Sequence, residues 1–243
     1  MPFCAFGLAI VAMVLLAAGP LGWRLGWWHF RFAFSTLMPW SGYCGIAAVV
    51  AAVLALAVGR RLHNRRQVAI GAFAFVVGAL IAYVPWHYEE MRGTVPSIDD
   101  ITTDWVNPPQ FQAVLPVRKA ADANSVDYKG TKVSDLQRKA YPDIAPLNLN
   151  IPPPQAFARA LAVAERMEWT IVASDAAAGQ IEASQSSRWF GFTDDIVVRI
   201  TPTDSGSRID MRSESRYGRG DFGVNAARIR KYLAALQDAA KGG

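Results

Sequence analysis

The sequence predicts an α-helical membrane anchor of three transmembrane helices, followed by an α+β domain with an antiparallel sheet of about four strands and two helices. Three long apolar runs precede residue 95, and strand-like segments lie between two amphipathic helices in the rest of the chain. All three histidines and both cysteines lie in the first part. We therefore divide the chain into an anchor, residues 1–95, and a domain, residues 96–243.

Each apolar run is close to the length that a helix needs to cross a membrane. The runs extend over about 3–21, 42–58 and 68–86, and about 20 residues of helix cross the hydrocarbon layer. A buried helix of a globular domain would carry a polar face, and these runs carry none. No Lys or Arg precedes the first run, so we interpret it as an uncleaved helix rather than as a signal peptide.

The arginines between the helices predict the orientation of the chain. The loop 60–66 has four arginines in seven residues, whereas the loop 23–41 has only Arg24 and Arg31. Short basic loops stay in the cytoplasm. We therefore expect a protein of the bacterial inner membrane, with its N-terminus in the cytoplasm and its C-terminal domain in the periplasm.

Charge and residue types limit the possible functions. Residues 1–95 hold seven basic and two acidic residues, so they carry the whole net charge of +5. This excess follows membrane orientation, and we do not expect a nucleic-acid partner. Residues 96–243 contain neither His nor Cys, which excludes Cys/His zinc sites, Cys nucleophiles and Ser-His-Asp triads there. We expect no metal, no cofactor and no catalytic residue.

The loop between the first two helices is rich in aromatic residues. Trp23, Trp27, Trp28 and Trp40 are suited to the headgroup level of a bilayer, and we interpret them as an interfacial aromatic loop that contacts membrane lipids. A platform for a lipid, a quinone or a partner helix is the alternative. The apolar runs carry no charge at mid-depth, so an ion pathway is not indicated.

The domain begins with an irregular stretch and continues with regular elements. Residues 89–152 are rich in Pro, Asp and Asn, and we expect them to wrap a core. Pro152 opens a helix with an apolar face, and Asp221 is suited to cap a final helix. Between these helices, strands are predicted at 169–174, 179–188, 195–201 and 208–217.

The last strand alternates charged residues with apolar or small ones. One face holds Arg208, Asp210, Arg212, Glu214 and Arg216. Because the signs alternate, we expect a solvated, salt-bridged outer face rather than an anion site with unpaired arginines. Asp194 and Asp195 point to opposite faces of their strand, which makes them a poor catalytic pair.

Several motifs resemble a known family. They are Ile101-Thr-Thr-Asp with Asn107-Pro-Pro, Tyr141-Pro-Asp-Ile, Trp189-Phe-Gly-Phe-Thr-Asp-Asp-Ile-Val-Val-Arg-Ile, and the stretch 208–229 that contains Tyr217-Gly-Arg-Gly-Asp-Phe-Gly. Across 97–238 the chain is similar to the domain of unknown function 1499 family, in its membrane-anchored proteobacterial branch. The resemblance implies no catalytic residues.

Three functions are compatible with these features. The first is a non-enzymatic accessory, scaffold or partner-binding module of a membrane or envelope complex. The second is a binding module for a lipid or other amphiphile, held between the sheet and the Pro-rich segment. The third is a carboxylate-based hydrolase of envelope material that uses some of Asp99, Asp104, Asp143, Asp210 and Glu214. For the first, the candidate docking surface consists of Trp189, Phe190, Phe192, Arg212, Arg216 and Arg219.

Overall fold

The computed structural model describes residues 1–241 and divides into two compact units. The anchor unit is Met1–Thr94 with Arg188–Gly191, and the C-terminal unit is Val95–Ser187 with Phe192–Gly243. Each unit has its own buried core.

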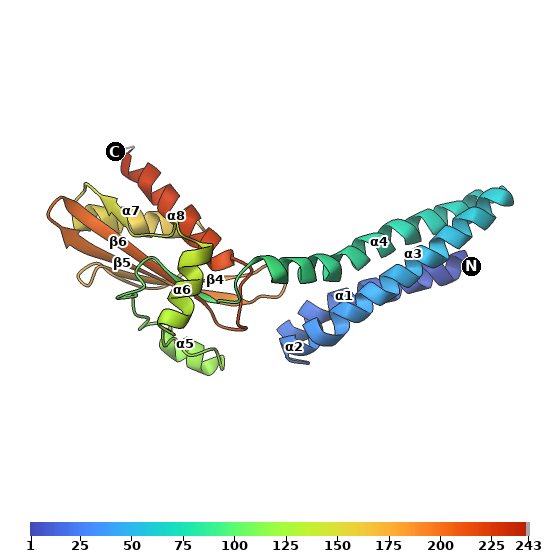
Figure 1. Cartoon of the computed structure of the whole chain (residues 1–243), viewed down its shortest axis with the longest axis horizontal. Coiled ribbons are helices and arrows are strands. Elements are labelled where there is room, and N and C mark those ends of the chain that lie inside the picture. The colour runs from blue at the N-terminus through green and yellow to red at the C-terminus, as the bar shows by residue number, and fades with distance from the viewer. Residues whose placement is uncertain (242–243) are drawn as a thin grey trace. The chain divides into compact units, whose positions relative to one another are not determined.

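Three long helices form the anchor unit (Figure 1): α1 (Pro2–Arg24), α3 (Met38–Arg61) and α4 (Arg65–Thr94). A short helix, α2 (Phe30–Phe32), and a π-helical turn, η1 (Ala33–Leu37), connect α1 to α3. All three long helices have the length and apolar composition needed to cross a membrane. The predicted helical membrane anchor is confirmed, although each helix extends beyond its apolar run into the flanking polar residues.

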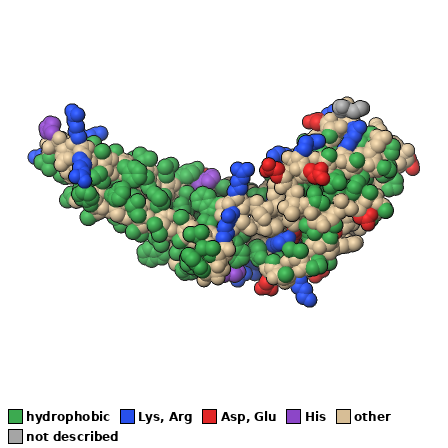
Figure 2. Space-filling model, turned by 180° about the vertical axis from the view of Figure 1, so that it is seen from behind, with side chains coloured by type: hydrophobic (Ala, Val, Ile, Leu, Met, Phe, Trp, Pro, Cys, Tyr) green, Lys and Arg blue, Asp and Glu red, His purple; other side chains and the backbone are tan. Residues whose placement is uncertain are grey.

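Small residues allow these helices to pack closely. The buried cluster of the anchor unit consists of alanines on α1, α3 and α4. A Cβ atom added to Gly45 would lie 2.7 Å from the carbonyl oxygen of Gly78, so this contact between α3 and α4 requires glycine. Large apolar side chains point outward instead, as the space-filling view shows (Figure 2). This division of small and large residues is typical of membrane helices.

The C-terminal unit is built on an antiparallel sheet with the strand order β1-β6-β5-β4-β3, in which β2 also pairs with β6. The strands found among the described residues are β1 (Asp100–Thr102), β2 (Leu147–Leu149), β3 (Thr170–Asp175), β4 (Gln180–Ser186), β5 (Thr193–Thr203) and β6 (Gly206–Ser215). The predicted antiparallel α+β domain is confirmed, but residues 1–241 contain six strands rather than four. Strands β1 and β2 have three residues each, too few to show an alternating pattern, and they form by pairing with β6.

Two amphipathic helices cover one face of this sheet: α7 (Pro153–Arg166) and α8 (Val224–Lys241) (Figure 1). Their apolar sides bury Phe157, Tyr232 and Leu236 against strand residues such as Ile196 and Ile209. We call this the helix face of the sheet. The carboxylate of Asp221 accepts the N–H groups of Gly223 and Asn225 at 2.8 and 2.6 Å, and thus caps the first turn of α8 as predicted.

The stretch predicted to be irregular also contains two helices, α5 (Leu115–Ala120) and α6 (Thr131–Ala140). From α6, Gln137 reaches the outer edge of β1. Its side-chain oxygen accepts the N–H of Thr102 at 3.0 Å, and its amide nitrogen donates to the carbonyl of Thr102 at 2.7 Å. One side chain therefore replaces a neighbouring strand and closes that sheet edge.

Candidate functional site

The face of the sheet opposite α7 and α8 is charged and buried. Arg212, Glu214 and Asp210 have exposed fractions of 0%, 1% and 1%. The expectation of a solvated outer face is therefore wrong. Residues 103–130, which we call the covering segment, lie over this face and pack Phe111 and Val114 against Val197 of β5. These apolar contacts exclude water from the charged row.

Arg212 lies at the centre of the charged face. Its Nε and one terminal nitrogen each donate to Asp100 at 2.9 Å, and it also contacts Glu214 at 3.2 Å. It donates to the carbonyl of Val126 at 2.7 Å, and the ring of Phe111 lies 5.0 Å from its guanidinium carbon. A buried arginine is tolerated only when its donors find acceptors, and the bidentate pair with Asp100 supplies two of them.

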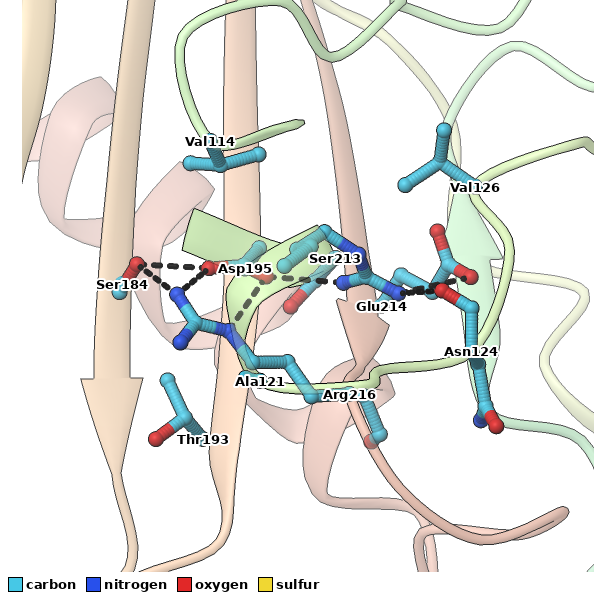
Figure 3. Close-up of polar contacts among 12 residues, drawn as sticks. Val114, Ala121, Asn124, Val126, Ser184, Thr193, Asp195, Ser213, Glu214 and Arg216 are labelled. Carbon is cyan, nitrogen blue, oxygen red and sulfur yellow. Dashed lines mark hydrogen bonds and ion pairs between the residues drawn. The ribbon is translucent and has the colours of Figure 1, made fainter. Parts of the chain in front are cut away.

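A second centre is Asp195, which faces the covering segment from β5 (Figure 3). It accepts two hydrogen bonds from Arg216, at 2.8 and 2.7 Å, and one each from Ser184 at 2.6 Å and Arg118 at 2.8 Å. Burial by itself would raise the pKa of Asp195, but the hydrogen bonds from Arg216, Ser184 and Arg118 outweigh it and lower that pKa. Asp195 is therefore ionised at neutral pH.

Glu214 joins the two centres. Its carboxylate lies 3.2 Å from Arg212 and 3.4 Å from Arg118, and its residue is paired directly opposite Asp100 in the sheet. Burial raises its pKa to about 8, and the negative charge of Asp100 adds to this, while the two arginines oppose it. Burial also raises the pKa of Asp100. We refer to these linked side chains as the ionic network: Asp100, Arg118, Ser184, Asp195, Arg212, Glu214 and Arg216.

One further carboxylate attaches the covering segment to the sheet. Glu182 of β4 accepts the N–H groups of Gln112, Ala113 and Val114 at 2.9, 3.0 and 3.0 Å. These groups lead into α5, whose side chain Arg118 then reaches Asp195. The start of α5 is thus held by a residue about 70 positions further along the chain.

A separate cluster occupies the other end of the same sheet face. Arg199 and Arg208 both contact Asp104 and Asp210, at 3.0–3.2 Å. Asp210 is buried, whereas the side chains of Arg199 and Arg208 are 20% and 39% exposed. This cluster is therefore in contact with solvent, unlike the ionic network.

At one end of the sheet, polar side chains are also buried on the helix face. Arg228 of α8 donates to Asp194 at 2.6 Å and to Ser213 at 2.9 Å, and Asn225 donates to the backbone carbonyl of Asp99 at 3.1 Å. Asp194 and Asp195 therefore lie on opposite faces, as the strand parity predicted. Each has its own arginine partners.

The acids considered for hydrolysis do not converge. Asp143 pairs with Arg230 at the surface, and the hydrogen bonds from that arginine lower the pKa of Asp143. Asp99 contacts Lys129 at 3.3 Å. Asp104 and Asp210 share their two arginines, and Glu214 belongs to the ionic network. No group of three or more potential metal ligands is found in residues 1–241.

The residues of the predicted docking surface have different environments. Trp189 is 58% exposed, Phe190 and Phe192 are partly buried, and Arg219 is exposed. Arg212 and Arg216, in contrast, point into the ionic network and are 0% and 9% exposed, so their guanidinium groups do not lie at the surface. In the aromatic loop, Trp27 and Trp40 are exposed, and Trp23 and Trp28 are partly buried.

Sequence reasoning missed Asp100, Arg118 and Asp195 as partners of the charged strand. Glu182 was expected to pair across to that strand, but it accepts the N–H groups of the covering segment instead. Strand parity already placed Asp195 on the same face as Glu214. No local signal identified Arg118, because its role depends on how the covering segment folds back over the sheet.

The structure thus defines a class of protein in which a helical membrane anchor precedes an α+β domain with an arginine–carboxylate network under one sheet face. Residues 100–236 match the family described as protein of unknown function (DUF1499), and the chain belongs to that family. The family assignment made from the sequence motifs is therefore confirmed, and the membrane-anchored proteobacterial branch stays a prediction. None of the curated proteins compared with the chain matches it.

Proposed function

We propose that this is an inner-membrane protein whose periplasmic C-terminal domain binds another membrane or envelope protein, as a non-enzymatic accessory or scaffold subunit. The proposal rests on one observation, which is that charged residues of the stretch 208–229 form ion pairs within their own domain. Arg212, Glu214 and Arg216 bond to acids and arginines of the same domain, under the covering segment. These residues hold the fold together and are buried away from any substrate. We therefore assign the binding function to the outer surface of the domain.

The arrangement gives little support to acid–base catalysis. Asp100 and Glu214 are neighbouring carboxyl groups whose pKa values are both raised, a feature often found in active sites. They are, however, only 2% and 1% exposed. A general acid or base must come within hydrogen-bond distance of its substrate, and here Arg212 and the covering segment fill that space.

The amphiphile hypothesis also lacks support at the place where we expected the ligand. Phe111, Val114, Val126 and Val197 pack together between the sheet and the covering segment. A lipid chain inserted there would separate Glu182 from its three N–H donors and would expose the ionic network.

The outer side of this region offers a better binding surface. Large apolar side chains are exposed on the covering segment and on α6. Exposed apolar groups of this kind mark protein-interaction sites, and the ionic network holds the segment that carries most of them in a fixed position. These exposed apolar residues are Trp105 (37% exposed), Val106 (85%), Leu115 (41%), Val117 (47%) and Leu136 (46%).

Site-specific photo-crosslinking in intact cells tests this proposal. A crosslinker at position 106 is expected to trap one protein, and the same protein is expected to co-purify with the full-length chain in mild detergent. A crosslinker at Lys231, exposed on α8, is the matched control and should not trap it. Val106→Asp should weaken the co-purification. Recovery of the chain alone, with no partner trapped from position 106, would count decisively against the proposal.

A further inference from the structure

We propose that the hollow between the end of α3 and the start of α4 binds the phosphate group of an anionic phospholipid. This basic hollow has a volume of about 540 Å³ and is lined by Gly59, Arg60, His63, Arg65, Val68 and Ala69. The proposal concerns the anchor unit alone and does not depend on the protein-binding function proposed for the C-terminal domain.

The local sequence explains why a hollow forms here. Helix α3 ends at Arg61 and α4 begins at Arg65, so the chain reverses within three residues. His63 adopts a left-handed conformation with φ of 53°, which turns the chain back. A Cβ atom on Gly59 would lie 3.2 Å from side-chain atoms of Gln67 and Val68, so glycine allows the two helices to approach each other directly below the turn.

The arginines around the hollow give it a strong positive charge that no nearby acidic side chain in the described part of the chain compensates. Arg60, Arg61, Arg65 and Arg66 are all exposed, and basic side chains gather at this end of the helices (Figure 2), where the sequence has arginines and no lysine. Among residues 1–241, none of the four has an acidic partner, because the ion pairs of the anchor unit all lie near Glu89 and Glu90. Those acids are roughly 35 Å away along α4, at about 1.5 Å per residue. An anion is therefore the ligand that this charge favours.

The lining of the hollow favours a lipid phosphate over a free one. Arg60 and Arg65 approach from the two sides of the turn, and guanidinium groups bind phosphate oxygens through paired hydrogen bonds. The remaining wall, formed by Val68, Ala69 and Gly59, is apolar and can contact the glycerol and acyl carbons. The site also lies at the end of two helices that are long and apolar enough to cross a membrane, and the ends of such helices meet the lipid headgroups.

Two double variants separate a specific site from general attraction between charges. R60Q/R65Q removes the two arginines that line the hollow, and R61Q/R66Q removes their two neighbours. Both variants lose the same charge and keep two arginines in the loop, so the charge bias that sets orientation is equal in the two. Full-length protein in detergent is titrated with phosphatidylglycerol and with phosphatidylcholine, and bound lipid is counted by native mass spectrometry.

We expect wild type and R61Q/R66Q to retain one phosphatidylglycerol in preference to phosphatidylcholine. R60Q/R65Q should bind phosphatidylglycerol at least about tenfold more weakly, because charged hydrogen bonds are lost. Ala69→Trp, which adds bulk at the apolar wall of the hollow and keeps all four arginines, should also weaken the preference. Circular dichroism of each variant verifies that the helices remain formed.

Three results would overturn the proposal. Equal weakening in the two double variants would show general attraction without a site, and no weakening in R60Q/R65Q would show that these arginines do not bind the lipid. Displacement of phosphatidylglycerol by inorganic phosphate at an equal concentration would show that the apolar wall contributes nothing.

Discussion

The two faces of the sheet in the C-terminal unit are both buried, but in different ways. The helix face buries apolar side chains such as Ile196, Ile209 and Met211 under α7 and α8. The opposite face buries arginines and carboxylates under the covering segment, with only a small apolar cluster around Phe111. One face is therefore stabilised mainly by removal of apolar area from water, whereas the other holds buried charges that are matched by partners of opposite sign.

This difference has a physical consequence. Apolar burial has no direction and tolerates changes of shape, as long as volume is preserved. A buried ion pair contributes little net stability when complete, because desolvation offsets its attraction, but an incomplete pair is strongly destabilising. The ionic face therefore fixes one position of the covering segment more strictly than an apolar contact of the same size.

The largest expected effect is that of Arg212→Ala. The change leaves Asp100 and Glu214 buried beside each other without their shared cation, so we expect a loss of about 3–5 kcal/mol in the free energy of unfolding. Chemical unfolding of the full-length protein in detergent, followed by tryptophan fluorescence, measures this change.

Arg219→Ala is the matched control, since Arg219 lies on the same chain segment but is exposed. We expect a change within about 0.5 kcal/mol for this variant. If Arg212→Ala were as mild as the control, the ionic network would not stabilise the domain in the way that its geometry indicates.

The second expected effect is an unusual dependence on pH. The pKa of Glu214 is raised to about 8 in the folded protein from an ordinary value of 4.5. Between these values the folded state binds more protons than the unfolded state, so stability falls as pH rises through this window. A single group contributes at most about 1.4 kcal/mol per pH unit. Asp195, whose pKa is lowered, contributes in the opposite direction only at acidic pH.

Unfolding midpoints at several pH values between 5 and 8 measure this slope. In Glu214→Gln the group no longer titrates, and the slope should become flatter, although Asp100 continues to contribute in the same direction. An identical slope in wild type and Glu214→Gln would show that Glu214 stays ionised throughout the window.

The contrast between the two faces also explains which parts of the fold the sequence could predict. The three membrane helices follow from uncharged apolar runs, and β3 to β6 follow from alternation along each strand. Both patterns are local. The helix face could be predicted for the same reason, since its apolar residues recur at the helical and strand periods.

The missed elements depend on contacts between distant residues. Strand β1 needs β6 on one side and the side chain of Gln137 on the other. Helix α5 starts directly after Val114, the last of the three residues whose N–H groups Glu182 accepts. The alternating charges of β6 look like a solvated face because nothing local shows that Phe111 and Val114 will cover them. When a long polar segment precedes a charged strand, the sequence alone does not show whether that strand face is solvated. The segment can fold back over the strand and bury its charges.

A smaller effect compares conservative changes on the two faces. Arg212→Lys keeps the charge but loses the paired geometry to Asp100, and we expect a cost of about 2 kcal/mol. Ile209→Val removes one methylene from the helix face and should cost about 1 kcal/mol. Unfolding curves of the two variants, measured side by side, test whether the ionic face is less tolerant. The reverse order would show that the charged face adapts as readily as the apolar one.

The smallest expected effect is local and concerns how the covering segment is attached. Glu182→Gln weakens the bonds to the N–H groups of Gln112, Ala113 and Val114, at a cost of about 1 kcal/mol. Hydrogen exchange should become several-fold faster at these three amides and within α5, while amides of the helix face such as that of Ile209 keep their rates. Glu165→Gln, which removes an exposed acid from α7, is the control and should change neither. Uniformly faster exchange would mean that the covering segment and the sheet unfold together, whereas a local change would mean that the ionic face opens on its own while the helix face stays intact.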